Sequence, residues 1–173
     1  IEDFANVQRV IDGDTIIVNN KSVRLLGINT PEKGEKYYGE AKEFLEELIL
    51  DKKVRLEGNG KDRYYRRLSY LFFDKENINV KIIKEGFANI YLLENRRYEK
   101  ELKNAWRECL NKNKNLCERS KDECANCIEL KKFDYKNQEV IFYNKCNFDC
   151  DLNDWIVKDE GRKKFVFFLR IAL

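Results

Sequence analysis

The 173-residue sequence contains no histidine, no methionine and a single proline. Without histidine, no imidazole can serve as catalytic base, nucleophile partner or metal ligand, so catalysis would have to use carboxylates, arginines and a metal-activated water. No apolar run approaches the roughly 20 residues of a membrane-spanning helix. The lack of methionine indicates that the native start lies outside this sequence, and no signal peptide is visible in residues 1–6.

The net charge is only +3. Such a small surplus argues against a general polyanion-binding protein. Residues 121–173 carry equal numbers of basic and acidic side chains, so the surplus lies entirely before Lys121. The length suits one domain of ordinary size, alone or with a small module.

Short strands separated by turn residues dominate the first third of the chain. Apolar spacing predicts strands over 4–11, 14–19 and 22–28, joined at Asp12-Gly13 and Asn19-Asn20. Two more strands are expected over 54–57 and 68–73. Phe87–Leu93 is also expected to be extended.

Three segments have the periodicity of helices. We expect a helix over 39–50, a short one over 79–85 with Asn79 as N-cap and Gly86 as its stop, and a long one over 97–116. Five strands with three helices predict a mainly β fold, a five-stranded barrel of the oligonucleotide-binding type.

A boundary is predicted near residues 118–126, where charge and cysteine replace helical periodicity. We therefore expect a barrel domain over 1–120 and a small β module over 121–173. The module's strands are expected over 128–130, 139–143, 155–158 and 164–169. About fifty residues is marginal for an independent all-β core.

Three stretches carry the chemistry: IDGDT at 11–15, RLLGINTPE at 24–32 and DRYYRRL at 62–68. They combine carboxylates, two guanidinium groups and aromatic rings. Arginine's planar fork suits a phosphate. Proline at 31 ends a strand and can present Glu32 as a base. Each residue alone also has an ordinary structural interpretation, as a turn carboxylate, salt bridge or surface charge.

These motifs, with VKIIKEGFANIY at 80–91, resemble the staphylococcal nuclease (thermonuclease) family over roughly residues 4–117. The resemblance implies a calcium-dependent enzyme that hydrolyses DNA and RNA. Water attacks phosphorus and the 5′ oxygen leaves, giving 3′-phosphate ends. We expect a monomer that prefers single-stranded or frayed nucleic acid.

Carried over to this sequence, the resemblance assigns individual roles. It implies catalytic roles for Arg24, Glu32 and Arg66, with Glu32 as the base and the arginines on the phosphate. Asp14, Asn29 and Thr30 would hold the calcium ion, and Arg63, Tyr64 and Tyr91 would bind substrate.

Two departures from the family pattern concern the metal and the substrate loop. Asn29 replaces a carboxylate that the family often has, which should weaken calcium binding or favour another hard cation. Tyr65 and Arg67 replace glycines that commonly flank the second arginine. The alternative function is a non-catalytic nucleic-acid or partner-binding module of the Tudor-nuclease kind. Retention of both arginines and the glutamate favours the enzyme.

Residues 127–173 resemble, more weakly, part of an immunoglobulin-like lamin-tail domain, through CIEL at 127–130, VIFYNKC at 140–146 and DLNDW at 151–155. This implies a binding module for another protein or an envelope component, and covers about half of such a domain.

Four of the six cysteines fall late, at 124, 127, 146 and 150. Their spacing allows a four-thiolate zinc site or disulfides. We favour disulfides, with Cys127 and Cys146 near the ends of neighbouring strands, and Cys124 and Cys150 as further candidates. Cys109 is expected to be a plain buried thiol. Disulfides favour an extracellular or cell-envelope location, or a hyperthermophile's interior.

Overall fold

The computed structural model describes residues 2–92, 96–134, 136–137, 139–153, 155, 157–158 and 164–165. The chain divides into two compact units, Ile1–Glu118 and Arg119–Leu173, which are described separately. Among the described residues, no helix has the length and hydropathy to span a membrane.

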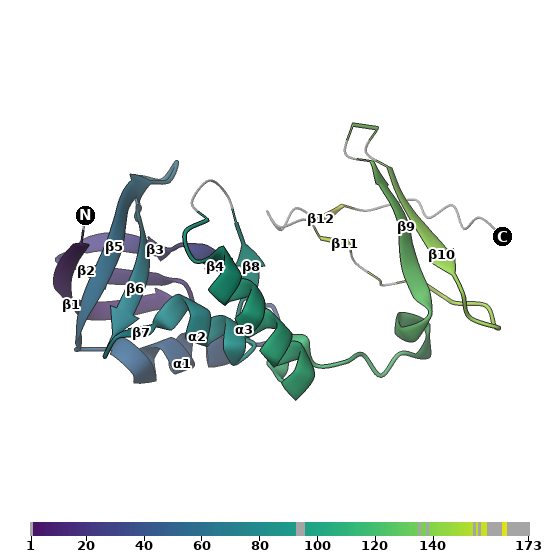
Figure 1. Ribbon diagram of the computed structural model, residues 1–173, viewed down its shortest axis with the longest axis horizontal. Coiled ribbons are helices and arrows are strands. Elements are labelled where there is room, and N and C mark those ends of the chain that lie inside the picture. The colour runs from purple at the N-terminus through teal and green to yellow at the C-terminus, as the bar shows by residue number, and fades with distance from the viewer. Residues whose placement is uncertain are drawn as a thin grey trace. The chain divides into compact units, whose positions relative to one another are not determined.

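The first unit is a closed five-stranded barrel with three helices, as predicted (Figure 1). The strands in chain order are β1 (Glu2–Asp12), β2 (Thr15–Val18), β3 (Lys21–Leu25), β5 (Lys53–Lys61) and β6 (Arg67–Phe73). Neighbouring strands pair antiparallel in the order β3-β2-β1-β5-β6. Parallel pairing of β3 with β6 closes the barrel.

Three short strands supplement the barrel. β4 (Gly27–Asn29) pairs with β8 (Asn89–Tyr91), and β7 (Glu76–Asn77) pairs with β6. The expected extended segment over 87–93 is thus a strand over 89–91, and Leu93 lies outside the described residues.

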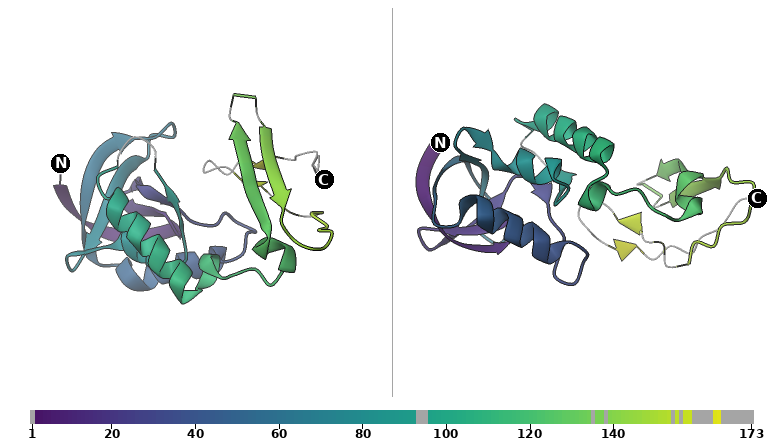
Figure 2. Two further views of the ribbon diagram at one scale, coloured as in Figure 1. Left: turned by 45° about the vertical axis from the view of Figure 1, so that its right-hand side comes forward. Right: turned by 90° about the horizontal axis from the view of Figure 1, so that it is seen from below.

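The helices are α1 (Tyr38–Ile49), α2 (Ile78–Lys84) and α3 (Glu99–Lys112). In Figure 2, α2 and α3 lie side by side, and their residues pack together. α3 ends at Asn113 in a left-handed conformation, and residues Asn115–Cys117 form a separate 3₁₀ turn. The single helix expected over 97–116 is therefore too long at both ends.

The predicted N-cap of α2 is wrong. Asn77 is the cap, and its side chain accepts from the Val80 backbone N–H at 3.3 Å. Asn79 is fully buried. Its amide donates to the Leu26 carbonyl at 2.7 Å and accepts from the Leu71 N–H at 3.0 Å. Asn79 thus lies inside the first turn of the helix, and its partners are the backbone of Leu26, between β3 and β4, and of Leu71 on β6.

The core of the first unit lies between the barrel strands and the helices. Fully buried side chains include Ile16, Leu25, Leu45, Leu56, Tyr70, Ile82 and Leu102. Alternating apolar residues of the strands and the apolar stripes of the helices supply them, as periodicity predicts. This core provides a rigid base for the polar groups at one rim.

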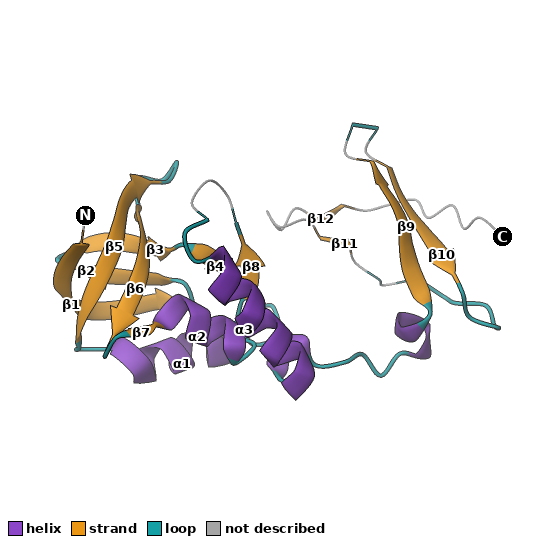
Figure 3. Cartoon of the chain, in the orientation of Figure 1, coloured by secondary structure: helices purple, strands orange, loops and turns teal. Residues whose placement is uncertain are grey.

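The second unit begins with a 3₁₀ turn (Glu123–Asn126) and a hairpin of β9 (Ile128–Asp134) and β10 (Glu139–Asn144) (Figure 3). β11 (Val157–Lys158) pairs with β12 (Lys164–Phe165). β9 and β10 begin where expected, but β9 runs on to Asp134 rather than to residue 130, and β10 runs on to Asn144 rather than to residue 143. The expected strand beyond Phe165 lies outside the described residues.

All six cysteines are paired, as Cys109–Cys117, Cys124–Cys150 and Cys127–Cys146. The preference for disulfides among the late cysteines is confirmed. The interpretation of Cys109 as a plain thiol is wrong, because the turn at Asn115–Cys117 folds back and brings Cys117 against α3. Helical periodicity shows that Cys109 is buried but cannot show its partner.

Candidate active site

The site begins at the turn between β1 and β2, where Asp14 is only 6% exposed. Its Oδ2 accepts hydrogen bonds from the backbone N–H of Thr30 at 2.9 Å and from the Thr30 hydroxyl at 3.0 Å. The Arg24 Nη2 lies 3.1 Å from the same oxygen. A buried carboxylate needs such partners to remain charged. The first two motifs therefore meet at Asp14.

Gly13 allows the turn to approach Thr30. A Cβ at this position would lie 2.8 Å from the Thr30 Cγ2 and 2.9 Å from the Ala41 Cβ, closer than real Cβ atoms come. Glycine is needed here for the close approach of the β1–β2 turn to the end of β4. The turn sequence thus fixes the contact of Asp14 with Thr30.

Arg24 projects from β3, with a side chain that is only 13% exposed. Its Nη1 donates to the Leu25 carbonyl at 2.9 Å, and its Nη2 also donates to the Asn29 Oδ1. One guanidinium nitrogen therefore contacts both Asp14 and Asn29. Arg24, which was expected to bind the phosphate, therefore lies in one cluster with Asp14 and Asn29, which were expected to bind the metal.

Arg66 reaches this cluster because the barrel closes between β3 and β6. Arg24 is in register with Leu68 across that pairing, and Arg66 immediately precedes β6. The Arg66 Nη1 donates to the Thr15 hydroxyl at 3.4 Å, and that hydroxyl donates to the Asp14 Oδ1 at 3.2 Å. Thr15 thus links the second arginine to the buried carboxylate.

Asp62 orients Arg66. One carboxylate oxygen accepts from the backbone N–H groups of Tyr64 and Arg66 at 2.9 and 3.0 Å, and the other accepts from the Arg66 Nε at 2.7 Å. Although partial burial opposes it, these hydrogen bonds hold the pKa of Asp62 below its usual range. The ionised carboxylate keeps the loop and the guanidinium in one arrangement.

The loop between β5 and β6 displays two aromatic rings. Tyr64 is 62% exposed, with the guanidinium carbons of Arg63 and Arg66 at 4.8 and 5.5 Å from its ring centroid. Tyr65 is 82% exposed and has a φ of 63°, in the left-handed region. A bulky residue in this region is strained. The loop thus presents a cationic and aromatic surface beside Arg66.

Glu32 and Tyr91 lie near the ends of the paired strands β4 and β8. Glu32 is exposed, two residues beyond Thr30, and its N–H donates to the Glu35 Oε2 at 2.9 Å. Tyr91 is half-buried and in register with Gly27. Strand pairing therefore brings Tyr91 to the strand that leads into Asn29 and Thr30.

Several oxygen groups lie close together at this rim. They are the Asp14 carboxylate, the Asn29 amide oxygen, which accepts from Arg24, and a second carboxylate, that of Asp12, which accepts from the Asp14 N–H at 3.1 Å. Burial and the neighbouring Asp14 carboxylate raise the pKa of Asp12. A cation would relieve this repulsion between carboxylates, and oxygen ligands are those that calcium and magnesium prefer.

Asp12, Thr15 and Asp62 were not among the predicted site residues. Asp12 and Thr15 belong to the same five-residue motif as Asp14, and Asp62 opens the arginine-rich stretch. Their positions within these motifs were the one feature of the sequence that could have indicated a role in the site. Only the folded chain shows that Thr15 and Asp62 position Arg66.

Comparison with known proteins gives related sequences for this barrel. A family model described as "Staphylococcal nuclease homologue" matches residues 22–119. An uncharacterized endonuclease of Haemophilus influenzae is 41% identical over 90 residues, which are 49% of this chain and 51% of that protein. The chain therefore spans about half the length of this relative.

Two thermonucleases match over a longer stretch. That of Staphylococcus hyicus is 36% identical over 128 residues, covering 66% of this chain and 76% of the relative. That of Staphylococcus intermedius is 37% identical over 126 residues, covering 65% and 75% respectively.

Proposed function

Because the chain belongs to the staphylococcal nuclease family, we propose that it is a nuclease that cleaves DNA and RNA with calcium and leaves 3′-phosphate ends. The observation that carries the proposal is the buried Asp14 carboxylate, held by Arg24 and Thr30 and joined through the Thr15 hydroxyl to Arg66. Two guanidinium groups and a buried carboxylate at one rim suit a phosphodiester.

Arg24 and Arg66 are the groups proposed to hold the scissile phosphate. Each guanidinium has fixed partners, Asp14 and Asn29 for Arg24, and Asp62 for Arg66. Preorganised donors stabilise the charge that develops on the phosphate oxygens without reorganising during the reaction. Each arginine donates hydrogen bonds to these oxygens.

Glu32 is the proposed general base. Its exposed carboxylate follows the buried Thr30 by two residues, and the Glu35 side chain holds its backbone. It would take a proton from the attacking water, while the 5′ oxygen leaves from the opposite side of phosphorus. A base of this kind needs its carboxylate within about 3 Å of the water.

Asp14, Asn29 and the Thr30 carbonyl would hold the divalent ion, with Asp12 nearby. The ion supplies Lewis-acid stabilisation of the phosphate and lowers the pKa of a water. Asn29 provides an oxygen but no charge, so calcium binding should be weaker than at a site with a further carboxylate.

The substrate chain is proposed to follow the loop between β5 and β6. Arg63 adds positive charge, and Tyr64 and Tyr65 offer exposed rings. Base stacking on aromatic rings is sequence-tolerant and contributes about 1–3 kcal/mol per base. Tyr91 is a further candidate contact. These features favour single strands, whose bases are available for stacking.

The wider setting is also part of the proposal. The barrel unit, over about residues 1–120, acts as a monomer in an extracellular or cell-envelope location, which suits its disulfide. Residues 121–173 are proposed to be part of a lamin-tail-like module that binds another protein or an envelope component.

The test is cleavage of a fluorescent single-stranded DNA in calcium, in EDTA, and in calcium with Glu32→Ala. We expect EDTA to abolish cleavage and Glu32→Ala to slow it by about 100-fold or more. Glu43→Ala removes an exposed glutamate of α1 and is the matched control. If folded Glu32→Ala cleaves at nearly the normal rate, Glu32 is not the base.

Absence of cleavage in calcium, magnesium and manganese by a folded chain that still binds DNA would instead indicate a non-catalytic binding module. Asn29→Asp is then the informative variant, because it restores a charged ligand. Analysis of the product ends distinguishes 3′-phosphate from 5′-phosphate.

A further inference from the structure

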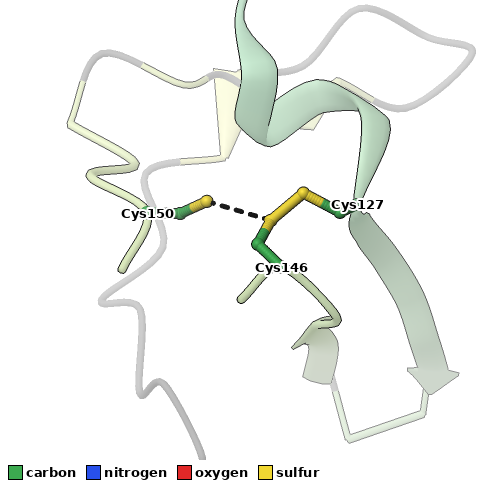
Figure 4. Close-up of side chains that lie close together, drawn as sticks. All are labelled: Cys127, Cys146 and Cys150. Atoms are coloured by element: carbon green, nitrogen blue, oxygen red, sulfur yellow. Dashed lines mark hydrogen bonds between the residues drawn. A yellow bond between two sulfur atoms is a disulfide. The ribbon is translucent and has the colours of Figure 1, made fainter. Parts of the chain in front are cut away.

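Three sulfur atoms lie close together in the second unit, those of Cys127, Cys146 and Cys150, and a fourth, that of Cys124, is bonded to one of them. Cys127 lies immediately before β9 and Cys146 follows β10, and these two form one disulfide. Cys150 is bonded to Cys124, the one buried residue of the described part of this unit. Figure 4 shows the Cys150 sulfur directed at the Cys127–Cys146 disulfide, 3.3 Å from the Cys146 Sγ.

We propose that these four cysteines, when reduced, bind one zinc ion, so that the pair of disulfides and a tetrathiolate zinc site are alternative cross-links of the same module. The Sγ atoms of Cys127, Cys146 and Cys150 all lie within 4.8 Å of one another. In a tetrahedral site with Zn–S bonds of about 2.3 Å, ligand sulfurs are about 3.8 Å apart. Small side-chain rotations would bring these three sulfurs to that spacing, and Cys124, now bonded to Cys150, would supply the fourth.

The backbone that carries the sulfurs is held by hydrogen bonds that do not depend on the disulfides. The Cys127 N–H donates to the Cys124 carbonyl at 3.1 Å, and the Lys145 N–H donates to the Cys127 carbonyl at 2.9 Å. The Cys146 N–H donates to the Asn144 side chain at 2.8 Å. These hydrogen bonds place the cysteines on one turn and at the adjoining hairpin ends, the arrangement that zinc binding would restore in the reduced chain.

The chemistry of the donor set selects the metal. Four thiolates in a C-x₂-C and C-x₃-C arrangement suit zinc, a borderline-soft ion without geometric preference of its own. A dithiol reductant gives each disulfide two electrons and two protons and itself becomes a disulfide. Zinc then displaces the four thiol protons.

The remaining disulfide provides an internal control. Cys109 and Cys117 lie in the barrel unit. Among the described residues, these two cysteines do not belong to a group of three or more side chains that could hold a metal ion. Reduction of this pair frees two thiols but creates no four-sulfur site. The chain thus contains a matched pair that should not bind the ion.

The test uses the full chain reduced with a water-soluble phosphine, which becomes a phosphine oxide with an oxygen from water. Titration with cobalt(II) should give one equivalent of tetrahedral cobalt with sulfur-to-metal charge-transfer absorption. One equivalent of zinc should remove these bands. The unreduced chain should bind none at this site, and Cys109→Ser/Cys117→Ser should retain the full signal.

Trp155 reports whether the module is folded. Its indole N–H donates to the Asp122 Oδ2 at 3.1 Å, and Asp122 caps the turn that contains Cys124. In a Trp106→Phe background, zinc should restore the emission of the reduced chain to that of the oxidised chain. Cys127→Ser/Cys150→Ser should lose both responses.

Two results would overturn the proposal. One is a reduced, unsubstituted chain that gives no tetrahedral cobalt spectrum at one equivalent. The other is the same spectrum in Cys127→Ser/Cys150→Ser, which would place the metal elsewhere. Neither depends on whether the chain cleaves nucleic acid, so failure here leaves the proposed nuclease chemistry untouched.

Discussion

The two units of the chain are stabilised in different ways. The barrel unit buries a large set of apolar side chains from five strands and three helices. Among the described residues of the second unit, only Cys124 is buried, and Leu130 and Phe133 of the hairpin are 59% and 67% exposed. One disulfide, Cys127–Cys146, joins the two ends of that hairpin, and the other, Cys124–Cys150, joins the turn before it to the chain after it.

The difference shows what a polar site needs. Asp14 and Arg24 can be held nearly buried because packed strands on both sides fix their distances. A unit that depends on cross-links fixes the backbone near the sulfurs but leaves its apolar side chains exposed. The charges that are proposed to act on a substrate accordingly lie on the barrel.

The largest expected effect is catalytic and confined to the barrel. Arg66→Ala should lower the rate of DNA cleavage by about 100- to 1,000-fold, because the preorganised donor that we propose for the phosphate is lost. A chain ending at Glu118 should retain its rate within about twofold. Single-turnover cleavage measures both.

Arg107→Ala is the control for Arg66→Ala, since Arg107 lies on α3 and its guanidinium donates to Asn104 at 2.8 Å. An equal loss of activity in this variant would mean that general positive charge, not a placed guanidinium, carries the effect. Loss of activity on truncation would make the second unit part of the active enzyme.

Truncation of a leucine should lower the free energy of unfolding far more in the barrel unit than in the second unit. Leu45→Ala leaves a cavity beneath α1, where Leu45 is fully buried, and should lower the free energy of unfolding by about 2–5 kcal/mol. Leu130→Ala should change it by no more than about 0.5 kcal/mol. Urea unfolding monitored through Trp106 for the barrel and Trp155 for the second unit separates the two. A large loss for Leu130→Ala would mean that its side chain packs against something.

Removal of the barrel's own disulfide should have an intermediate effect. Cys109→Ser/Cys117→Ser opens a loop of eight residues, which corresponds to about 2.5 kcal/mol in the chain-entropy model. Trp106 fluorescence during urea unfolding should show this loss, while cleavage at low temperature remains normal. A collapse of activity before unfolding would show that the α3 end supports the site directly.

The smallest effect, and the one with opposite signs in two assays, concerns Tyr65. Tyr65→Gly relieves the strain of the left-handed backbone, and it also adds conformational freedom to the unfolded chain, which opposes the gain. Because we expect the relief of strain to be the larger effect, the free energy of unfolding should rise by up to about 1 kcal/mol. Affinity for single-stranded DNA in EDTA should fall, because an exposed ring is lost.

Fluorescence anisotropy with a short labelled strand measures that affinity. Tyr65→Asn tolerates the same φ without a ring and should resemble Tyr65→Gly in binding. If stability rises while affinity stays constant, Tyr65 does not contact the nucleic acid.

Much of the barrel was predictable from local patterns. Alternating apolar residues with turns at Asp12-Gly13 and Asn19-Asn20 gave the first three strands, and helical periodicity gave α1. The third strand, expected over 22–28, is wrong at its end, because β3 stops at Leu25 and the separate β4 begins at Gly27. The predictions were wrong where the role of a side chain depends on partners outside its own helix or strand. Asn79 bonds the backbone of Leu26 and of Leu71 and is not a cap, and Cys109 has a disulfide partner beyond the end of its helix.

The sequence by itself determined the order of strands and helices, the family motifs and the residue types available for chemistry, because periodicity and turn propensity act over a few neighbouring residues. Only the tertiary structure decided which charges meet. Thr30 reaches Asp14 across 16 residues, and Arg66 reaches Thr15 across 51. These contacts depend on the close approach at Gly13 and on the register between β3 and β6, which barrel closure and core packing set together.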